Sequence, residues 1–286
     1  MQTPAGYRIV KLANGTHSVH SVAHRETFHP VIGPVAEAEA LYVRQLRLVE
    51  RVAAHNGEFV VWDVGLGAAA NVLTVLRATR SARCPLRVLS FDHTLEPLQF
   101  ALEHAATLGY FADYEDTLRQ LVRDRRASFQ DGNRQVIWEL HLGDFPTLLA
   151  DAQSSRSFPA PHAILFDAFS PAKNPAMWTQ PLFANLFRML DPARPCALPT
   201  YSRSTLLRVS LLLAGFYVGA GHSTGEKEET TIAANTLDLI TEPLDKEWLK
   251  RARVSGSAEP LWEPVYRQAP LQEETWEKLQ RHPQFA

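Results

Sequence analysis

Short apolar runs alternate with helical patterns along most of the chain. The runs predicted as strands are Phe59–Val64, Leu86–Phe91, Val136–Leu142, Ala163–Phe166, Pro195–Tyr201, Phe216–Ala220 and Thr230–Ala234. The segments predicted as helices are Ala68–Ala78, Leu95–Leu108, Met177–Leu190 and Thr205–Ala214. Strands that alternate with helices of this length are typical of a doubly wound, mostly parallel sheet. The pattern therefore predicts an α/β fold.

The chain before the first of these strands follows another pattern. Two extended runs, Tyr7–Leu12 and Thr16–Val22, are joined through Asn14-Gly15, which is a signal for a type I′ β-hairpin. A helical pattern follows over Val35–Ala53. We therefore predict an N-terminal extension, residues 1–55, made of a hairpin and a helix.

Two other segments do not fit the strand–helix alternation. Residues 113–135 form an insertion that we expect to be partly helical, and after Pro243 the chain is acidic and punctuated by prolines. We predict a core domain over residues 56–242, with the insertion inside it, and a peripheral C-terminal arm over residues 243–286.

Composition narrows the class of protein. Hydrophobic residues make up 45% of the 286 residues and charged residues 21%, which is typical of soluble globular domains. Two cysteines, Cys84 and Cys196, cannot build a disulfide framework. No signal peptide precedes the first run, and no apolar run approaches the roughly 18 residues of a membrane span. We expect a cytoplasmic protein without a membrane partner.

The chain has 29 basic and 31 acidic residues. This near balance of charge argues against a strongly basic nucleic-acid-binding protein. Two arginine clusters, over Arg77–Arg87 and Arg119–Arg126, are candidates for a local basic rim or for ordinary solvated helix faces. The histidines His17, His20 and His24, together with His29, lack a cysteine or acid that would complete a metal site. We therefore predict no metal.

Four predicted strands end in an acid, at Asp63, Asp92, Asp144 and Asp167. In a doubly wound sheet, ligands bind at the carboxyl ends of the strands. Any one of these acids could instead cap a helix. Four at one edge fit a polar ligand lying across it better.

The loop after the first core strand favours a particular class of ligand. Gly65 and Gly67 allow backbone to approach a ligand, but Ala70 stands where a dinucleotide fingerprint has its third glycine. Asp92 is placed to accept from ribose hydroxyls, which suits NAD or S-adenosylmethionine (SAM). Asp144, placed to accept from an adenine amino group, favours SAM.

The fourth strand end begins the most specific motif. Residues 167–178 read DAFSPAKNPAMW and closely resemble the DGFAPAKNPxMW segment of the MnmC-type tRNA methyltransferases. Residues 24–29 (HRETFH), with Gly33 and Glu37, resemble that family's GExxHS…G…E segment, and residues 225–231 (GEKEETT) resemble a late strand entry. The similarity covers roughly residues 7–235. The family's glycine loop usually reads GFGTG, whereas this chain ends it with Ala68 and Ala69.

The resemblance implies a Rossmann-like class I methyltransferase fold with SAM as cofactor. It implies a stand-alone enzyme, without the flavin oxidase fused to many relatives, that methylates the aminomethyl group of a wobble uridine in a tRNA anticodon loop. A separate enzyme would then supply the aminomethyl group. The cofactor-binding residues we predict are Asp63, Gly65, Gly67, Asn71, Asp92, Asp144 and Glu26.

Amine methylation needs an amine nitrogen that is neutral and aligned with the methyl carbon. We predict Asp167 as the catalytic residue that holds the amine. Phe169, Lys173 and Trp178 are the predicted substrate residues, through stacking on a base or contact with a phosphate. Two alternatives remain: a non-catalytic SAM-fold protein that binds RNA or regulates, and a methyl- or aminopropyltransferase for a small amine.

Overall fold

The computed structural model describes residues 6–151, 157–224 and 229–286. The chain forms two compact units. Unit 1 comprises Met1–Asp144, Leu165–Asp167 and Ser223–Glu228, and unit 2 comprises Phe145–Ile164, Ala168–His222 and Glu229–Ala286. The predicted division at residues 55 and 242 remains a prediction. In the described ranges no helix is both long and apolar enough to cross a membrane.

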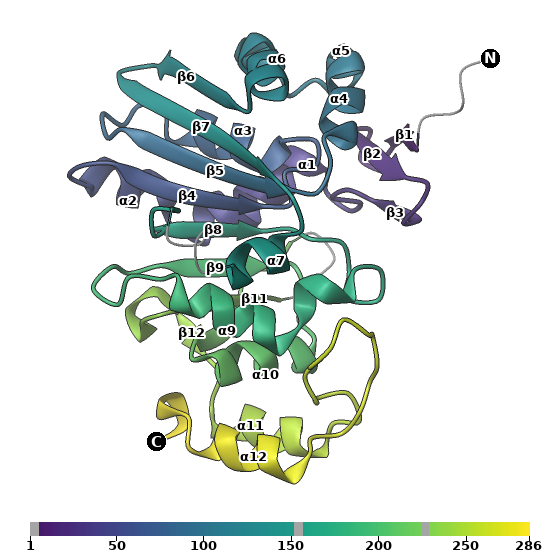
Figure 1. Ribbon diagram of the computed structural model, residues 1–286, viewed down its shortest axis with the longest axis vertical. Coiled ribbons are helices and arrows are strands. Elements are labelled where there is room, and N and C mark those ends of the chain that lie inside the picture. Colours follow the sequence, from purple (N-terminus) through teal and green to yellow (C-terminus); the bar gives the residue numbers. More distant parts are fainter. Residues whose placement is uncertain (1–5, 152–156, 225–228) are drawn as a thin grey trace. The chain divides into compact units, whose positions relative to one another are not determined.

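Unit 1 contains the first three of the seven predicted core strands and the end of the fourth (Figure 1). Its strands are β1 (Tyr7–Lys11), β2 (His17–Ser21), β3 (Glu26–Thr27), β4 (Phe59–Val64), β5 (Leu86–Asp92), β6 (Arg126–Asp131) and β7 (Arg134–Leu142). Its helices are α1 (Pro34–Ala38), the π-helix η1 (Glu39–Arg44), α2 (Leu48–Ala54), α3 (Ala70–Ala78), α4 (Glu96–Glu103), α5 (Ala105–Leu108), the 3-10 turn η2 (Ala112–Tyr114) and α6 (Glu115–Asp124).

The main sheet of unit 1 has the order β4-β5-β7-β6. β4, β5 and β7 are parallel, and β6 is antiparallel to β7. Residues 165–167 continue this unit beside β4, where the Asp167 N–H donates to the Val64 carbonyl at 2.9 Å. All six residues of β4 are buried, as expected for a strand covered on both faces. The predicted α/β fold is confirmed here.

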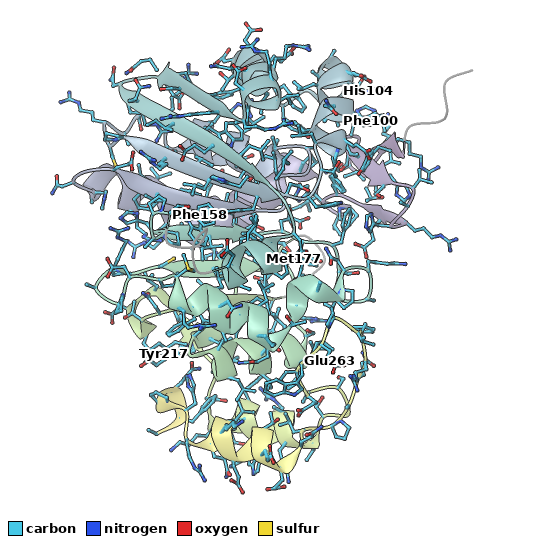
Figure 2. All side chains as sticks on the ribbon, viewed as in Figure 1. Phe100, His104, Phe158, Met177, Tyr217 and Glu263 are labelled. Atoms are coloured by element: carbon cyan, nitrogen blue, oxygen red, sulfur yellow. The ribbon has the colours of Figure 1, made fainter. Side chains whose placement is uncertain are left out.

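The N-terminal hairpin is confirmed, but its turn is not type I′. The Leu12 N–H donates to the Thr16 carbonyl at 2.8 Å, so the loop has three residues, ending at Gly15 with φ +85°. The Asn14 side chain instead accepts from the backbone N–H and the hydroxyl of Thr16. Tyr7 in β1 packs on Phe100 of α4 with ring centroids 6.0 Å apart, and Phe100 stacks on His104 at 4.3 Å (Figure 2).

Two elements of unit 1 differ from the prediction. The helix expected over Val35–Ala53 is divided, because Arg47 lies in the left-handed region with φ +50°. The insertion contains the expected helix, α6, but continues into β6, which pairs antiparallel with β7. The turn between them needs Gly132, since a Cβ there would lie 2.6 Å from the Arg80 carbonyl oxygen.

Unit 2 contains the remaining elements. Its strands are the first half of β8 (Ala163–Phe166), β9 (Ala197–Thr200), β10 (Tyr217–Gly221), β11 (Thr230–Ala234) and β12 (Glu242–Pro243). Its helices are α7 (Phe145–Ala150), α9 (Gln180–Arg188), α10 (Thr205–Ala214), α11 (Lys246–Val254), α12 (Glu273–Gln280) and the 3-10 turns η3 (Pro175–Trp178), η4 (Leu237–Leu239) and η5 (Pro283–Phe285). β8 is parallel to β9, whereas β11, β10 and β12 follow as antiparallel strands.

The C-terminal arm of unit 2 is more structured than its composition predicts. It contains α11 and α12, and the buried Glu259 carboxylate accepts from the Trp262 ring nitrogen, the Thr275 hydroxyl and the Gln272 N–H. The Gln284 side chain bonds both the N–H and the carbonyl of Val218 in β10. These bonds hold the arm against its own unit.

Candidate functional site

The glycine loop between β4 and α3 follows a backbone course that few side chains allow. Gly65 has φ +94° and Gly67 has φ +51°. A Cβ at Gly67 would lie 3.2 Å from the Phe28 ring. Ala69, where the resembling family usually has glycine, also adopts a positive φ of +62° as the N-cap of α3. The loop is therefore shaped for close approach of a ligand despite its alanines.

Asp92 holds this loop in place. Its Oδ2 accepts from the Gly67 N–H at 3.0 Å, and its Oδ1 accepts from the N–H groups of His93 and Thr94 at 2.7 and 3.3 Å. The His93 ring nitrogen also lies 3.2 Å from Oδ1, so only Oδ2, which has one hydrogen-bond partner among the described residues, has an acceptor position for a ribose hydroxyl. Asp92 thus acts first as the anchor of the loop, a role that the sequence did not predict.

Asp63 at the end of β4 is the most buried acid of this edge, with 1% of its surface exposed. Its Oδ2 accepts from the Ser90 hydroxyl at 2.7 Å, and that hydroxyl accepts from the Trp138 ring nitrogen at 2.9 Å. Its Oδ1 has no hydrogen-bond partner among the described residues. A buried oxygen of this kind fits the ammonium of an amino acid moiety, such as that of SAM.

Burial raises the pKa of Asp63 from 3.8 to about 7, and the nearby Asp167 and Asp92 add to the shift. The folded protein then binds one more proton than the unfolded chain between these two values. This contribution to stability is present at acid pH and is lost as the pH rises from about 4 to about 7.

The variant Asp63→Asn should therefore gain stability relative to the parent as the pH rises through this range, by up to about 1.4 kcal/mol per pH unit. Urea unfolding of both cofactor-free proteins at several pH values between about 5 and 8 measures it. A stability difference that does not change with pH would contradict the raised pKa.

Asp144 follows the carboxyl end of β7, in the unit 1 sheet. Its side chain is exposed, and its charge contributes to the raised pKa of His93, whose main cause is the hydrogen bond to Asp92. Glu26 lies in β3, opposite Ser21 of β2, and is half-buried. The roles of Asp144 and Glu26 in cofactor binding remain predictions.

Asp167 has partners from two other segments of unit 1. Its Oδ2 accepts from the Asn71 side-chain amide at 2.8 Å and lies 3.4 Å from His29 Nε2. Asn71, predicted to bind the cofactor, therefore orients the predicted catalytic acid. His29 and Glu37, whose atoms approach to 3.8 Å, were in the resembling segment but not in the predicted site. His29 and Glu37 are far from Asp167 in the sequence, so the sequence alone does not indicate that they lie close to it in the fold.

In unit 2 the motif after Asp167 folds into a tight loop. The Trp178 ring nitrogen donates to the Phe169 carbonyl at 2.7 Å, and the Tyr201 hydroxyl donates to the Ala168 carbonyl at 2.9 Å. Trp178 is fully buried, so its ring packs inside the unit and is not placed to stack on a base. Phe169 is half-buried, and Lys173 is exposed.

Known proteins show what this chain is similar to. Residues 111–236 match the model of a family described as S-adenosyl-L-methionine-dependent methyltransferase. This part of the chain is therefore similar to a SAM-dependent methyltransferase domain. SAM is accordingly its cofactor, and Asp63, the glycine loop and Asp92 offer the chemistry that a bound SAM molecule needs.

Relatives of this chain include the tRNA 5-methylaminomethyl-2-thiouridine biosynthesis bifunctional protein MnmC of Cupriavidus metallidurans. It is 31% identical over 224 residues, which are 75% of this chain and 32% of that protein. The same-named protein of Methylibium petroleiphilum is 29% identical over 82% of this chain and 35% of its own length. The chain thus spans about a third of the length of the curated relatives it matches. The resemblance predicted from residues 167–178 is confirmed.

A solved structure supports the fold of this chain. MnmC2 from Aquifex aeolicus matches with a TM-score of 0.72 and 21% identity, over 98% of this chain and 85% of that one. This similarity confirms the Rossmann-like fold. Residues 225–228 of the predicted late motif lie outside the described residues.

The arginines of the two clusters largely pair with other groups of unit 1. Arg77 donates to the Tyr110 and Phe111 carbonyls, and Arg80 pairs with Asp113 and Asp131. In the second cluster the ion pairs are Arg119 with Glu115, Arg123 with Asp124, and Arg126 with Glu139. These pairs favour a structural role over a strongly positive rim. Among the residues that the structure describes, no three His, Cys, Asp or Glu side chains are grouped to hold a metal.

Proposed function

We propose that this protein is an N-methyltransferase that transfers the methyl group of SAM to the aminomethyl group of a wobble uridine in tRNA. The observation that carries the proposal is the Asp167 carboxylate, held by Asn71 beside the end of β4. The DAFSPAKNPAMW motif that Asp167 begins, and the names of the curated relatives, point to the substrate.

In the proposed reaction, SAM supplies a methyl group on a positively charged sulfur. The amine nitrogen forms the new C–N bond as the C–S bond breaks, and the protein has to align the two. The Asp167 carboxylate accepts a hydrogen bond from an N–H of the amine. This bond orients the nitrogen lone pair towards the methyl carbon. A primary alkylamine is mostly protonated at neutral pH, so the site must also take one proton before transfer.

Residues other than Asp167 would bind the cofactor. Asp63 Oδ1 would accept from the cofactor's ammonium, and Asp92 would accept from a ribose hydroxyl while it fixes the Gly67 N–H. The positive charge of the ammonium would stabilise the ionised form of the Asp63 side chain. These roles leave Asp167 for the substrate amine.

Phe169 and Lys173 are the substrate residues we retain in the proposal. Phe169 is half-buried, so part of its ring is open to stack on a base. Lys173 is exposed and can meet a phosphate of the anticodon loop. We further propose that the protein acts in the cytoplasm and that a separate enzyme supplies the aminomethyl group.

A small amine is the second candidate substrate, because arginines of both clusters are paired with acids and do not form a strongly positive patch by themselves. The two are separated by offering labelled SAM with unfractionated tRNA and, in parallel, with a short diamine. Label in tRNA supports our proposal. Label in the diamine alone would replace tRNA by a small amine.

A further inference from the structure

His29 lies between two carboxylates of unit 1. Its Nδ1 is 3.8 Å from Glu37 Oε1, and its Nε2 is 3.4 Å from Asp167 Oδ2. The side chains of His29, Glu37 and Asp167 are 9%, 8% and 16% exposed. The buried His29 imidazole is thus the titratable side chain next to Asp167, the carboxylate that we assign to the substrate amine.

The backbone around His29 is held in an uncommon conformation. His29 has φ +48°, in the left-handed region. The preceding residue, Phe28, is bonded on both sides: its N–H donates to the Val19 carbonyl at 2.8 Å, and its carbonyl accepts from the Ser18 hydroxyl. Strain of this kind persists only where surrounding structure enforces it, and it concentrates at functional sites.

Carboxylates face the ring from two elements. Glu37 faces it from α1, and Asp167 faces it from the end of β8. Asp63 in β4 interacts in turn with Asp167 and with Asp92 of β5. An imidazolium between Glu37 and Asp167 compensates buried negative charge, whereas a neutral ring does not.

We infer that His29 is a positioning residue that acts through Asp167 and stores the proton taken from the substrate amine. This inference rests on the proposed function. The ammonium of the substrate gives one proton, by way of the Asp167 carboxylate, to the imidazole, and Glu37 stabilises the imidazolium. The neutral amine then forms the C–N bond as the C–S bond breaks, which leaves a methylated ammonium and a neutral thioether. The imidazolium returns its proton to solvent after turnover.

The variant His29→Asn tests this role, because asparagine tolerates a positive φ but cannot store a proton at neutral pH. We expect its single-turnover methylation of tRNA to fall by roughly 10²-fold at pH 7. The deficit should shrink towards pH 9.5, where a far larger fraction of the amine is neutral by itself. SAM affinity by calorimetry should stay within a few-fold of the parent.

Glu37→Gln should show the same pH-dependent deficit at smaller size, and it covers the case in which His29→Asn does not fold. His20→Asn is the matched control: His20 contacts Thr27 in the same hairpin and should keep the parent's profile. A His29→Asn deficit that is equal at every pH, or absent, would overturn the inference. A parent that binds SAM but methylates no amine would instead overturn the proposed function.

Discussion

Replacing Asp167 by alanine should lower single-turnover methylation by about 10²–10⁴-fold, the usual cost of losing a positioned proton acceptor. The variant loses the oxygen that accepts from Asn71 and faces His29. SAM affinity should stay within a few-fold of the parent, because Asp63 and Asp92 are unchanged. Rapid-quench measurement of labelled methyl transfer, with calorimetry for SAM, gives both quantities.

Asp167→Asn separates the two roles of the carboxylate. It keeps an oxygen for the Asn71 amide but carries no negative charge. If aiming the lone pair matters most, the asparagine variant should be clearly faster than the alanine variant. If proton transfer matters most, both should be equally slow and should recover as the pH rises. Parent-like rates in Asp167→Ala would contradict the catalytic assignment.

Gly67→Arg should weaken SAM binding by roughly 100-fold or more, which corresponds to about 2.7 kcal/mol. Gly67 has φ +51°, and a Cβ there would lie 3.2 Å from the Phe28 ring. An arginine side chain would also occupy the space that a ligand needs near the backbone. Isothermal titration with SAM measures the loss.

Gly57→Arg is the matched control for this variant. Gly57 has φ +96°, so it imposes comparable backbone strain, but nothing lies within 4 Å of its Cβ position. It precedes β4, at the other end of the strand from the loop. Both variants should lose similar stability in urea, while only Gly67→Arg loses SAM binding. Equal SAM affinity in the two variants would refute the proposed cofactor loop.

The core strands and several helices could be predicted because their local signals agree with their environment. β4 is an apolar run and is buried throughout. α10 begins and ends where predicted, because Ser204 caps its first turn through the Leu207 N–H and Gly215 ends it in the left-handed region.

Other elements could not be predicted because tertiary contacts decide them. β6 alternates exposed polar residues with buried ones and becomes a strand by pairing with β7. α11 and α12 are short and highly charged, so they depend on packing, and the start of α12 is also held by two hydrogen bonds to the buried Glu259.

The acids of the site could be predicted from their places at the strand ends, but their partners could not. Asn71, His29 and Asp167 come from distant parts of the chain, and only the fold brings Asn71 and His29 to one oxygen of Asp167. The anchoring of Gly67 by Asp92 is likewise a long-range contact. The motif predicts that Trp178 contacts the substrate, but the Trp178 side chain is fully buried and packs in the core of unit 2.

The central claim is that this chain methylates the aminomethyl group of a wobble uridine. The most direct measurement incubates the protein with methyl-labelled SAM and tRNA from a strain that lacks its gene, followed by nucleoside analysis by mass spectrometry. We predict that the label appears in a methylaminomethyl-uridine, that the aminomethyl-uridine decreases by the same amount, and that Asp167→Ala abolishes both changes. Binding of SAM with no label in any nucleoside would contradict the claim.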